Sequence, residues 1–299
     1  GSAKNGVDPG LFSREVLMRC HQSALFGEKE KGSVKITDAL KLASSAPISF
    51  GGSTTLVLGQ LEPEAGIIRL LNLGDSGAMV LRPAIRHFGK DDHQVLFPRC
   101  VLRTFDQSHG FNWPYQTRAK NFADVGESID DLTTPVKEGD VVIAASDGVL
   151  DNLFDEDIQI CVSAHLKVLM GDDPYAAQEA VSKLARQIAE NANAVGERKG
   201  DPKLATPFMQ AALAEDYNYQ GGKLDDVAIV CAVVRSGVRP ELKVMHNFSP
   251  ETKVYMPVQP VQGTIVPTAP TAAPLQSAVP KRGTPQGMGQ SPQGMRQSP

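Results

Sequence analysis

Three aspartates stand where a short apolar segment meets a turn, and each could place a carboxylate beside a ligand. They are Asp75 in LGDS, Asp147 in ASDG and Asp225 in KLDD. A carboxylate next to a buried strand is costly unless it is paired, hydrogen-bonded or bound to a metal. Lys223 is the only basic residue close to any of the three in sequence. Convergent carboxylates without His or Cys favour a hard cation, so these turns are candidates for a Mg²⁺ or Mn²⁺ site.

Each aspartate taken alone is explained at least as well by a turn. Asp-Gly and Asp-Ser favour turns in which the Asp side chain binds the local backbone. Asp226 fits a supporting residue or the start of a strand better than a ligand, and Asp151-Asn152 fits a cap for the segment that follows. The metal interpretation therefore depends on the three turns being brought together by the fold.

The segments around these turns have the pattern of β-strands. Three successive short strands are predicted at 54–61, 66–74 and 77–82, joined by tight turns in an antiparallel meander. Two further segments, 141–146 and 227–235, are almost wholly apolar, so both are predicted as central strands buried on two faces. Residues 94–105 add one or two strands, whereas 106–135 lack a regular pattern.

Helical periodicity appears before and between these strands. The predicted helices span 11–26, 37–45, 155–169, 174–194 and 207–214, with Thr37 and Asp173 as N-caps. Strands, then helices, then a closing strand describe an α+β protein in which antiparallel sheets are covered by helices.

The last fifty residues differ in composition from the rest. They contain ten of the 21 prolines and end in the repeat PQGMGQS–PQGMRQS. A segment of Pro, Gln, Gly, Ser and Thr with few aromatics cannot bury enough surface to offset the entropy of ordering. We therefore predict one folded domain over 1–249 and a disordered tail over 250–299.

Charge and cysteine content exclude several classes of protein. The tail carries four basic and one acidic residue, so the net charge of −4 leaves −7 on the body. That sign disfavours binding to nucleic acid. No run of 18 apolar residues exists, so no membrane span is expected. The four cysteines lie far apart without a CxxC pair, which fits free thiols in a reducing, intracellular compartment.

Four motifs occur in an order that resembles a known family. They are GGSTT (51–55), NLGDSGAMVLR (72–82), ASDGVLDN (145–152) and KLDDVAIVCAVV (223–234). Together they resemble the metal-dependent protein phosphatases, the PPM or type-2C Ser/Thr phosphatases, over about residues 6–236. The segments GVDPGLFSRE, WPYQ and GGKLDD are similar to one branch of that family, which includes mitochondrial and plastid members.

The resemblance implies a fold, a cofactor and a reaction. It implies a two-sheet β-sandwich flanked by helices, with two Mn²⁺ or Mg²⁺ ions between the sheets. It places Asp147 and Asp225 as metal ligands and Asp75 at a further, weaker metal. The implied activity is hydrolysis of phosphoserine and phosphothreonine in phosphoproteins by metal-activated water. We expect a monomer, and the branch points to a mitochondrion or plastid.

One part of the family pattern is missing. The first metal motif of the family is an Asp-Gly pair after an early strand, but no Asp-Gly precedes Asp147-Gly148 here. The first strands of the fold are therefore expected to be missing. Either the chain is a fragment of a longer enzyme, or it is a pseudophosphatase that serves as a binding or regulatory module. In both cases we expect this polypeptide to have little or no phosphatase activity, because each lost carboxylate weakens metal binding.

The aromatic segment WPYQ leaves two interpretations open. Trp113 and Tyr115 around Pro114 fit a loop on the substrate side or a turn that covers the sheet.

Overall fold

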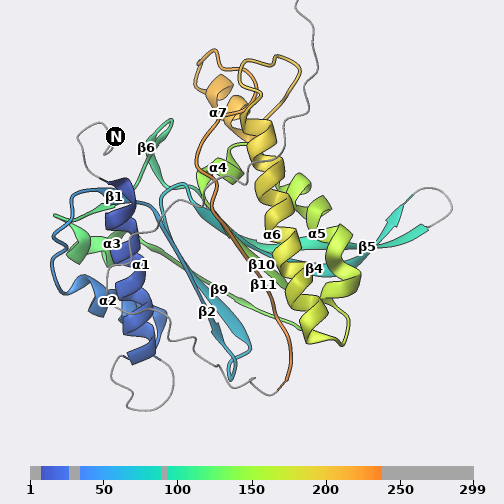
Figure 1. Ribbon diagram of the computed structural model, residues 1–299, viewed down its shortest axis with the longest axis horizontal. Coiled ribbons are helices and arrows are strands. Elements are labelled where there is room, and N and C mark those ends of the chain that lie inside the picture. The colour runs from blue at the N-terminus through green and yellow to red at the C-terminus, as the bar shows by residue number, and fades with distance from the viewer. Residues whose placement is uncertain (1–7, 27–33, 89–92, 238–299) are drawn as a thin grey trace, which may run out of the picture. The chain divides into compact units, whose positions relative to one another are not determined.

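Two antiparallel sheets form the centre of the computed structural model, which describes residues 8–26, 34–88 and 93–237 (Figure 1). One sheet has the order β2-β3-β9, formed by Leu56–Glu62, Ile67–Leu73 and Asp130–Pro135. The other has the order β11-β10-β4-β5, formed by Ile229–Val233, Val141–Ala145, Gly77–Phe88 and His93–Arg103. The predicted α+β class, with two packed antiparallel sheets flanked by helices, is confirmed.

Helices cover the outer faces of both sheets (Figure 1). On the β2-β3-β9 side lie α1 (Pro9–Phe26), α2 (Ile36–Ser44), η2 (Phe122–Asp124) and α3 (Val125–Ser128). On the other side lie α4 (Asp147–Leu150), α5 (Asp155–Leu169) and α6 (Pro174–Gly196), and α7 (Pro207–Ala214) follows α6. Four short strands complete the elements: β1 (Ser53–Thr54), β6 (Ser108–Gly110), β7 (Trp113–Pro114) and β8 (Thr117–Arg118).

The alternation of side chains along each strand produces three apolar layers. In β4, Ala78 and Val80 face the space between the sheets, whereas Met79 and Leu81 face α5 and α6. Successive side chains of a strand point to opposite faces, so one strand serves two layers. The strands near the candidate aspartates are therefore fixed from both sides.

Helix boundaries agree with the sequence where a cap is present. Helices α5 and α7 have the predicted bounds. In α6 the Asp173 carboxylate accepts hydrogen bonds from the Tyr175 and Ala176 amides at 2.8 and 3.2 Å. The prediction that Thr37 caps α2 is wrong. The N-cap is Lys35, and α2 begins at Ile36, because the Ile36 amide donates to Gln60 Oε1 at 2.8 Å and its side chain packs in the apolar layer beneath the helix.

The predicted meander of three strands is also wrong. Strands β2 and β3 pair, but β4 leaves this sheet and pairs with β10 and β5 instead. The Asp75-Ser76 turn thus carries the chain from one sheet to the other. Local pattern identifies a strand but does not say which sheet it joins.

The two strands predicted to be central, at 141–146 and 227–235, occupy different positions in the sheet. Strand β10 lies between β11 and β4, as predicted, but β11 is not central. Within the described part of the chain β11 pairs only with β10, and Val230 on its open face is 67% exposed. That face borders a groove of about 340 Å³, which β2 and α1 also line.

Residues 106–135 are more regular than predicted, because they contain β6 to β9, η2 and α3. The predicted disordered tail, 250–299, lies outside the described residues. Among the helices that the structure describes, none is both long and apolar enough to cross a membrane.

Candidate functional site

Asp147 and Asp225 are brought together by the pairing of β10 with β11. Asp147 follows the end of β10 in the first turn of α4, and Asp225 precedes the start of β11. Ser146 joins the two segments, because its hydroxyl accepts a hydrogen bond from the Ala228 amide at 3.0 Å and donates to the Asp226 carbonyl at 3.2 Å. Antiparallel pairing therefore places the end of one strand beside the start of the other.

Gly148 allows this approach. A Cβ atom at position 148 would lie 2.3 Å from the Asp226 carbonyl oxygen, which is closer than van der Waals contact permits. Glycine at position 148 is therefore required by backbone packing against the KLDD segment. Any larger residue would push the two aspartates apart.

The ammonium of Lys223 lies at the centre of an acidic cluster formed by Asp147, Asp151 and Asp225. Its Nζ atom is 2.9 Å from Asp147 Oδ2, 2.6 Å from Asp151 Oδ2 and 3.3 Å from Asp225 Oδ2. The Lys223 side chain is 15% exposed, so water screens these contacts only in part. In this arrangement the positive charge that compensates the cluster comes from the chain itself.

Asn152 holds Lys223 in this position. Its carboxamide nitrogen donates to the Lys223 carbonyl at 2.8 Å and to the Gly148 carbonyl at 2.9 Å, and its oxygen accepts from the Lys223 amide at 2.9 Å. Asn152 is 3% exposed. The backbone of the lysine is thus tied to the turn that presents Asp147.

Burial and mutual repulsion perturb the carboxylates. Burial, with the charge of Asp147 second, raises the pKa of Asp75 to about 6. Burial also raises the pKa of Asp151 to about 6, although Lys223 opposes the shift. Burial acts to lower the pKa of Lys223, but Asp151 and Asp147 outweigh it and raise this pKa above its ordinary value. The lysine is therefore held in its charged form.

Asp75 lies near this cluster, in the turn that crosses between the sheets. The Thr55 and Ser76 hydroxyls are 2.8 Å apart, and Gln107 bonds both the amide and the carbonyl of Gly74 at 3.0 Å. Gly74 has a φ of +94°, and a Cβ there would lie 2.5 Å from Thr55 Cγ2 and from the Tyr115 carbonyl. Glycine is thus the residue that lets the turn pass beneath the 107–115 segment.

Aromatic rings lie on one side of Lys223. Its ammonium is 5.0 Å from the centre of the Phe208 ring, within the range of a cation–π contact. Phe208 in turn contacts Phe111 and Tyr219, at centroid distances of 5.1 and 4.8 Å. Phe111 reaches this group from the turn between β6 and β7. The 108–115 segment therefore contacts the site as well as covering the sheet.

Sequence reasoning missed two members of the site. Asp151 and Asn152 were predicted to cap the following segment, but Asp151 contacts Lys223 and Asn152 binds its backbone. The spacing of Asp147 and Asp151 could have indicated that Asp151 joins the site, because residues i and i+4 of a helix lie on the same face. Within the described residues, no group of three or more His, Cys, Asp or Glu side chains has the spacing of a metal site. The cation at the centre is the Lys223 ammonium.

Comparisons with known proteins agree on one family. No family model matches the chain. Probable protein phosphatase 2C 80 of Arabidopsis thaliana is 35% identical over 236 residues, which cover 79% of this chain and 50% of that protein. Protein phosphatase PTC7 homolog of Homo sapiens is 28% identical over 239 residues, covering 77% and 70%. The X-ray structure of the photosystem II phosphatase PBCP has a TM-score of 0.60 and 24% identity, over 79% of this chain and 83% of that one.

The extent of the match has one limit. The chain spans about half the length of the first curated relatives that it matches, 50% and 44%. The solved structure supports the fold, and the curated relatives carry the family name. The chain belongs to the protein phosphatase 2C family, the metal-dependent protein phosphatases.

Proposed function

We propose that Asp147 and Asp225 provide part of the metal site of a Mn²⁺- or Mg²⁺-dependent phosphatase that acts on phosphoserine and phosphothreonine in proteins. The observation that supports this most strongly is their convergence on one positive charge. Two carboxylates from separate segments lie 2.9 and 3.3 Å from the same nitrogen atom. A position that stabilises an ammonium with carboxylate oxygens has the electrostatics that a divalent cation needs.

The donor set fits a hard cation in kind but falls short in number. Carboxylate oxygens are the ligands that Mg²⁺ and Mn²⁺ prefer. Asp147 and Asp225 supply two ligands, and Asp75 is close enough for the charge of Asp147 to raise its pKa. An octahedral shell needs about six ligands, so the remainder must be water, substrate or other protein groups.

Each residue has a proposed role in this site. Asp147 and Asp225 would hold the cation, and Asp75 would hold a further, weaker one. Ser146, Gly148 and Asn152 fix the backbone that presents them. The bound cations would supply the charge that activates a hydrolytic water and neutralises phosphate oxygens. Lys223 would compensate the carboxylates whenever the cation is absent.

We propose further that the 299-residue chain alone is weakly active or inactive. Its sequence contains no Asp-Gly pair before Asp147-Gly148, so the carboxylate that bridges two metals in the family is not supplied by a matching motif. The alternative is a non-catalytic pseudophosphatase that serves as a binding or regulatory module. The position of Lys223 favours that alternative, because its ammonium already neutralises the acidic cluster.

Calorimetric titration with Mn²⁺ tests the metal site, and turnover of p-nitrophenyl phosphate tests the activity. We expect weak binding of Mn²⁺ that Asp147→Asn reduces further, and turnover close to background. If Mn²⁺ does not bind, or binds equally well after Asp147→Asn, the proposed metal site is wrong. Rapid Mn²⁺-dependent turnover that Asp147→Asn abolishes would contradict the proposed inactivity and the pseudophosphatase alternative together.

A further inference from the structure

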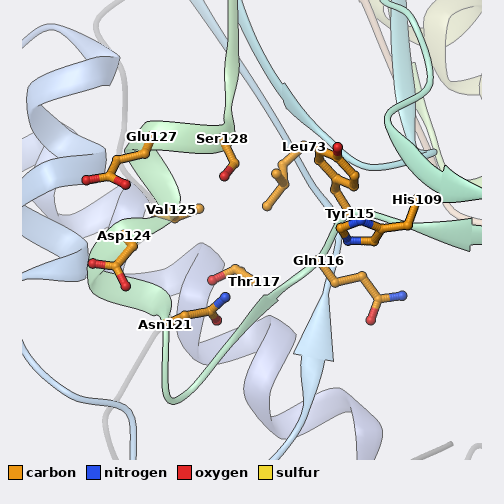
Figure 2. Close-up of a pocket in the computed structure, with 10 residues that line it drawn as sticks. All are labelled: Leu73, His109, Tyr115, Gln116, Thr117, Asn121, Asp124, Val125, Glu127 and Ser128. Atoms are coloured by element: carbon orange, nitrogen blue, oxygen red, sulfur yellow. The ribbon is translucent and has the colours of Figure 1, made fainter.

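A pocket of about 360 Å³ lies beside the candidate metal site and plays no part in it. It opens between the end of β3 and the segment from β7 to α3. Figure 2 shows Asp124 and Glu127 on one side, Tyr115 and His109 on the other, and Thr117 between them. We name it the Thr117 pocket.

The hydroxyl of Thr117 lacks a hydrogen-bond partner. Thr117 is 2% exposed, and its Oγ1 is one of the two buried side-chain polar atoms without a partner in the described part of the chain. In Figure 2 this oxygen points to the Asp124 side of the pocket. An unpaired buried hydroxyl costs free energy. A bound donor would recover it after a small movement of the Thr117 side chain, because Oγ1 is itself buried.

The charged groups of the pocket lack partners too. Neither Asp124 nor Glu127 forms an ion pair with a basic residue in the described ranges, and both are exposed. On the opposite side, the rings of His109 and Tyr115 contact each other in a tilted arrangement with centroids 4.2 Å apart. Two carboxylates, a free hydroxyl and an aromatic surface together are suited to a planar cation with several N–H donors, which is a guanidinium group.

The position of the pocket relates it to the proposed metal site, where the cations would bind the phosphate. Leu73 lines the pocket, and Asp75 follows two residues later across the Gly74 turn, within about 7 Å. Gln107 joins the two regions, because it bonds Gly74 on one side and the Ser128 carbonyl at 3.1 Å on the other. An extended peptide advances about 3.3 Å per residue. A peptide with phosphate near Asp75 would therefore bring a side chain two or three residues away to the pocket.

We propose that the Thr117 pocket binds the guanidinium of an arginine two or three residues from the phosphorylated residue of the substrate. The proposal rests on the proposed function for the position of the phosphate. The pocket would then select phosphoproteins with a basic residue beside the phosphorylated one. Its wall from β8 to α3 would act as a specificity element of the phosphatase.

The test uses the full chain with Mn²⁺ and a pair of peptides that carry a non-hydrolysable phosphonate in place of the phosphate and differ only by arginine or citrulline at this position. Citrulline keeps the shape of arginine but removes its charge. Trp113 is the only tryptophan of the chain, and its ring lies 4.9 Å from that of His109, so its fluorescence reports binding without turnover. We expect the arginine peptide to bind about five- to ten-fold more tightly. Equal affinities would overturn the proposal.

Two variants locate the effect in the pocket. Asp124→Asn combined with Glu127→Gln should reduce the preference for arginine to less than about two-fold. Glu190→Gln removes an exposed charge on α6 and should keep the full preference. Thr117→Val preserves the side-chain shape and should weaken binding of the arginine peptide about three-fold, which keeps the test valid if the double variant fails to fold. A preference that survives both pocket variants, as it survives in the Glu190→Gln control, would place the arginine elsewhere.

The Mn²⁺ titration of the same protein separates this proposal from the proposed function. If Mn²⁺ binding depends on Asp147 but arginine and citrulline peptides bind equally, the pocket proposal is wrong and the metal site stands. If the arginine preference is present but no Mn²⁺ binding occurs, the pocket stands as a peptide site and the metal function is wrong.

Discussion

Replacing Lys223 by methionine removes the ammonium from the acidic cluster while keeping an apolar side chain of similar length beside Phe208. In the metal-free protein, Asp147, Asp151 and Asp225 would then face one another without compensation. Removing one partner of a fully buried ion pair costs about 3–5 kcal/mol. The three carboxylates are 28%, 24% and 40% exposed, so solvent reduces this cost, and we expect about 2–3 kcal/mol.

The assay is thermal unfolding in EDTA, followed by titration with Mn²⁺. One kcal/mol corresponds to about 2–4 °C in Tm for a domain of this size, so Lys223→Met should lower Tm by about 4–12 °C. The same change should strengthen Mn²⁺ binding about ten-fold or more, because the cation no longer competes with the ammonium. Mn²⁺ should therefore restore more stability to the variant than to the parent protein.

Lys183 provides a matched control. It pairs with Glu179 at 2.9 Å on the surface of α6, where both side chains are about two-thirds exposed. Lys183→Met should change the free energy of unfolding by less than about 0.5 kcal/mol and leave Mn²⁺ binding unaltered. If Lys223→Met has no larger effect than Lys183→Met, the ammonium does not compensate the cluster and the reasoning fails.

Three further changes test the geometry of the site and the pocket. In urea denaturation, Gly148→Ala should lower the free energy of unfolding by about 2–3 kcal/mol, because its Cβ would clash with Asp226. Gly126→Ala is the control: its Cβ would meet open space, so this change should be neutral or stabilising. Because the pKa of Asp75 is raised to about 6, its contribution to stability is full below about pH 4 and is lost as pH rises through 6. Asp75→Asn in EDTA should therefore gain stability relative to the parent between pH 4 and 7, and parallel pH profiles would contradict this. Thr117→Val removes an unpaired buried hydroxyl and should raise Tm by about 2–4 °C in calorimetry, and a lower Tm would show that the hydroxyl is paired.

The elements that the sequence predicts well are those with a local signal at their ends. Helix α6 begins after Asp173 because that carboxylate accepts two backbone amides, and such a cap is visible in the sequence. Strand β9, in contrast, starts with Asp130-Asp131 and contains two threonines, so its composition resembles a loop. It is a strand because Arg69 on β3 pairs with Asp131 and because the backbones of β3 and β9 match along their length.

The candidate site was predictable in part. The convergence of Asp147 and Asp225 follows from two apolar strands that pair side by side, and the sequence indicates both strands. The contribution of Asp151, and the place of Lys223 at the centre of the cluster, depend on how α4 meets the KLDD segment, which no local pattern encodes. The sequence predicts β11 as a central strand, whereas β11 lies at the edge of its sheet. The reason for this error is similar. An apolar strand looks central in sequence whether or not a neighbour covers it.

The contact between Gly148 and the Asp226 carbonyl has a consequence for mutational tolerance. It brings together the two turns that carry the proposed ligands, and the Ser146 hydroxyl bonds the same carbonyl, so the separation of the turns does not depend on the side chains of Asp147 or Asp225. Those side chains can therefore be exchanged while the scaffold stays in register. Histidine or cysteine at these two positions would offer softer donors on the same framework. At the proposed metal site, the choice of metal would thus be separate from the architecture that holds it, and a change of metal preference would require few substitutions.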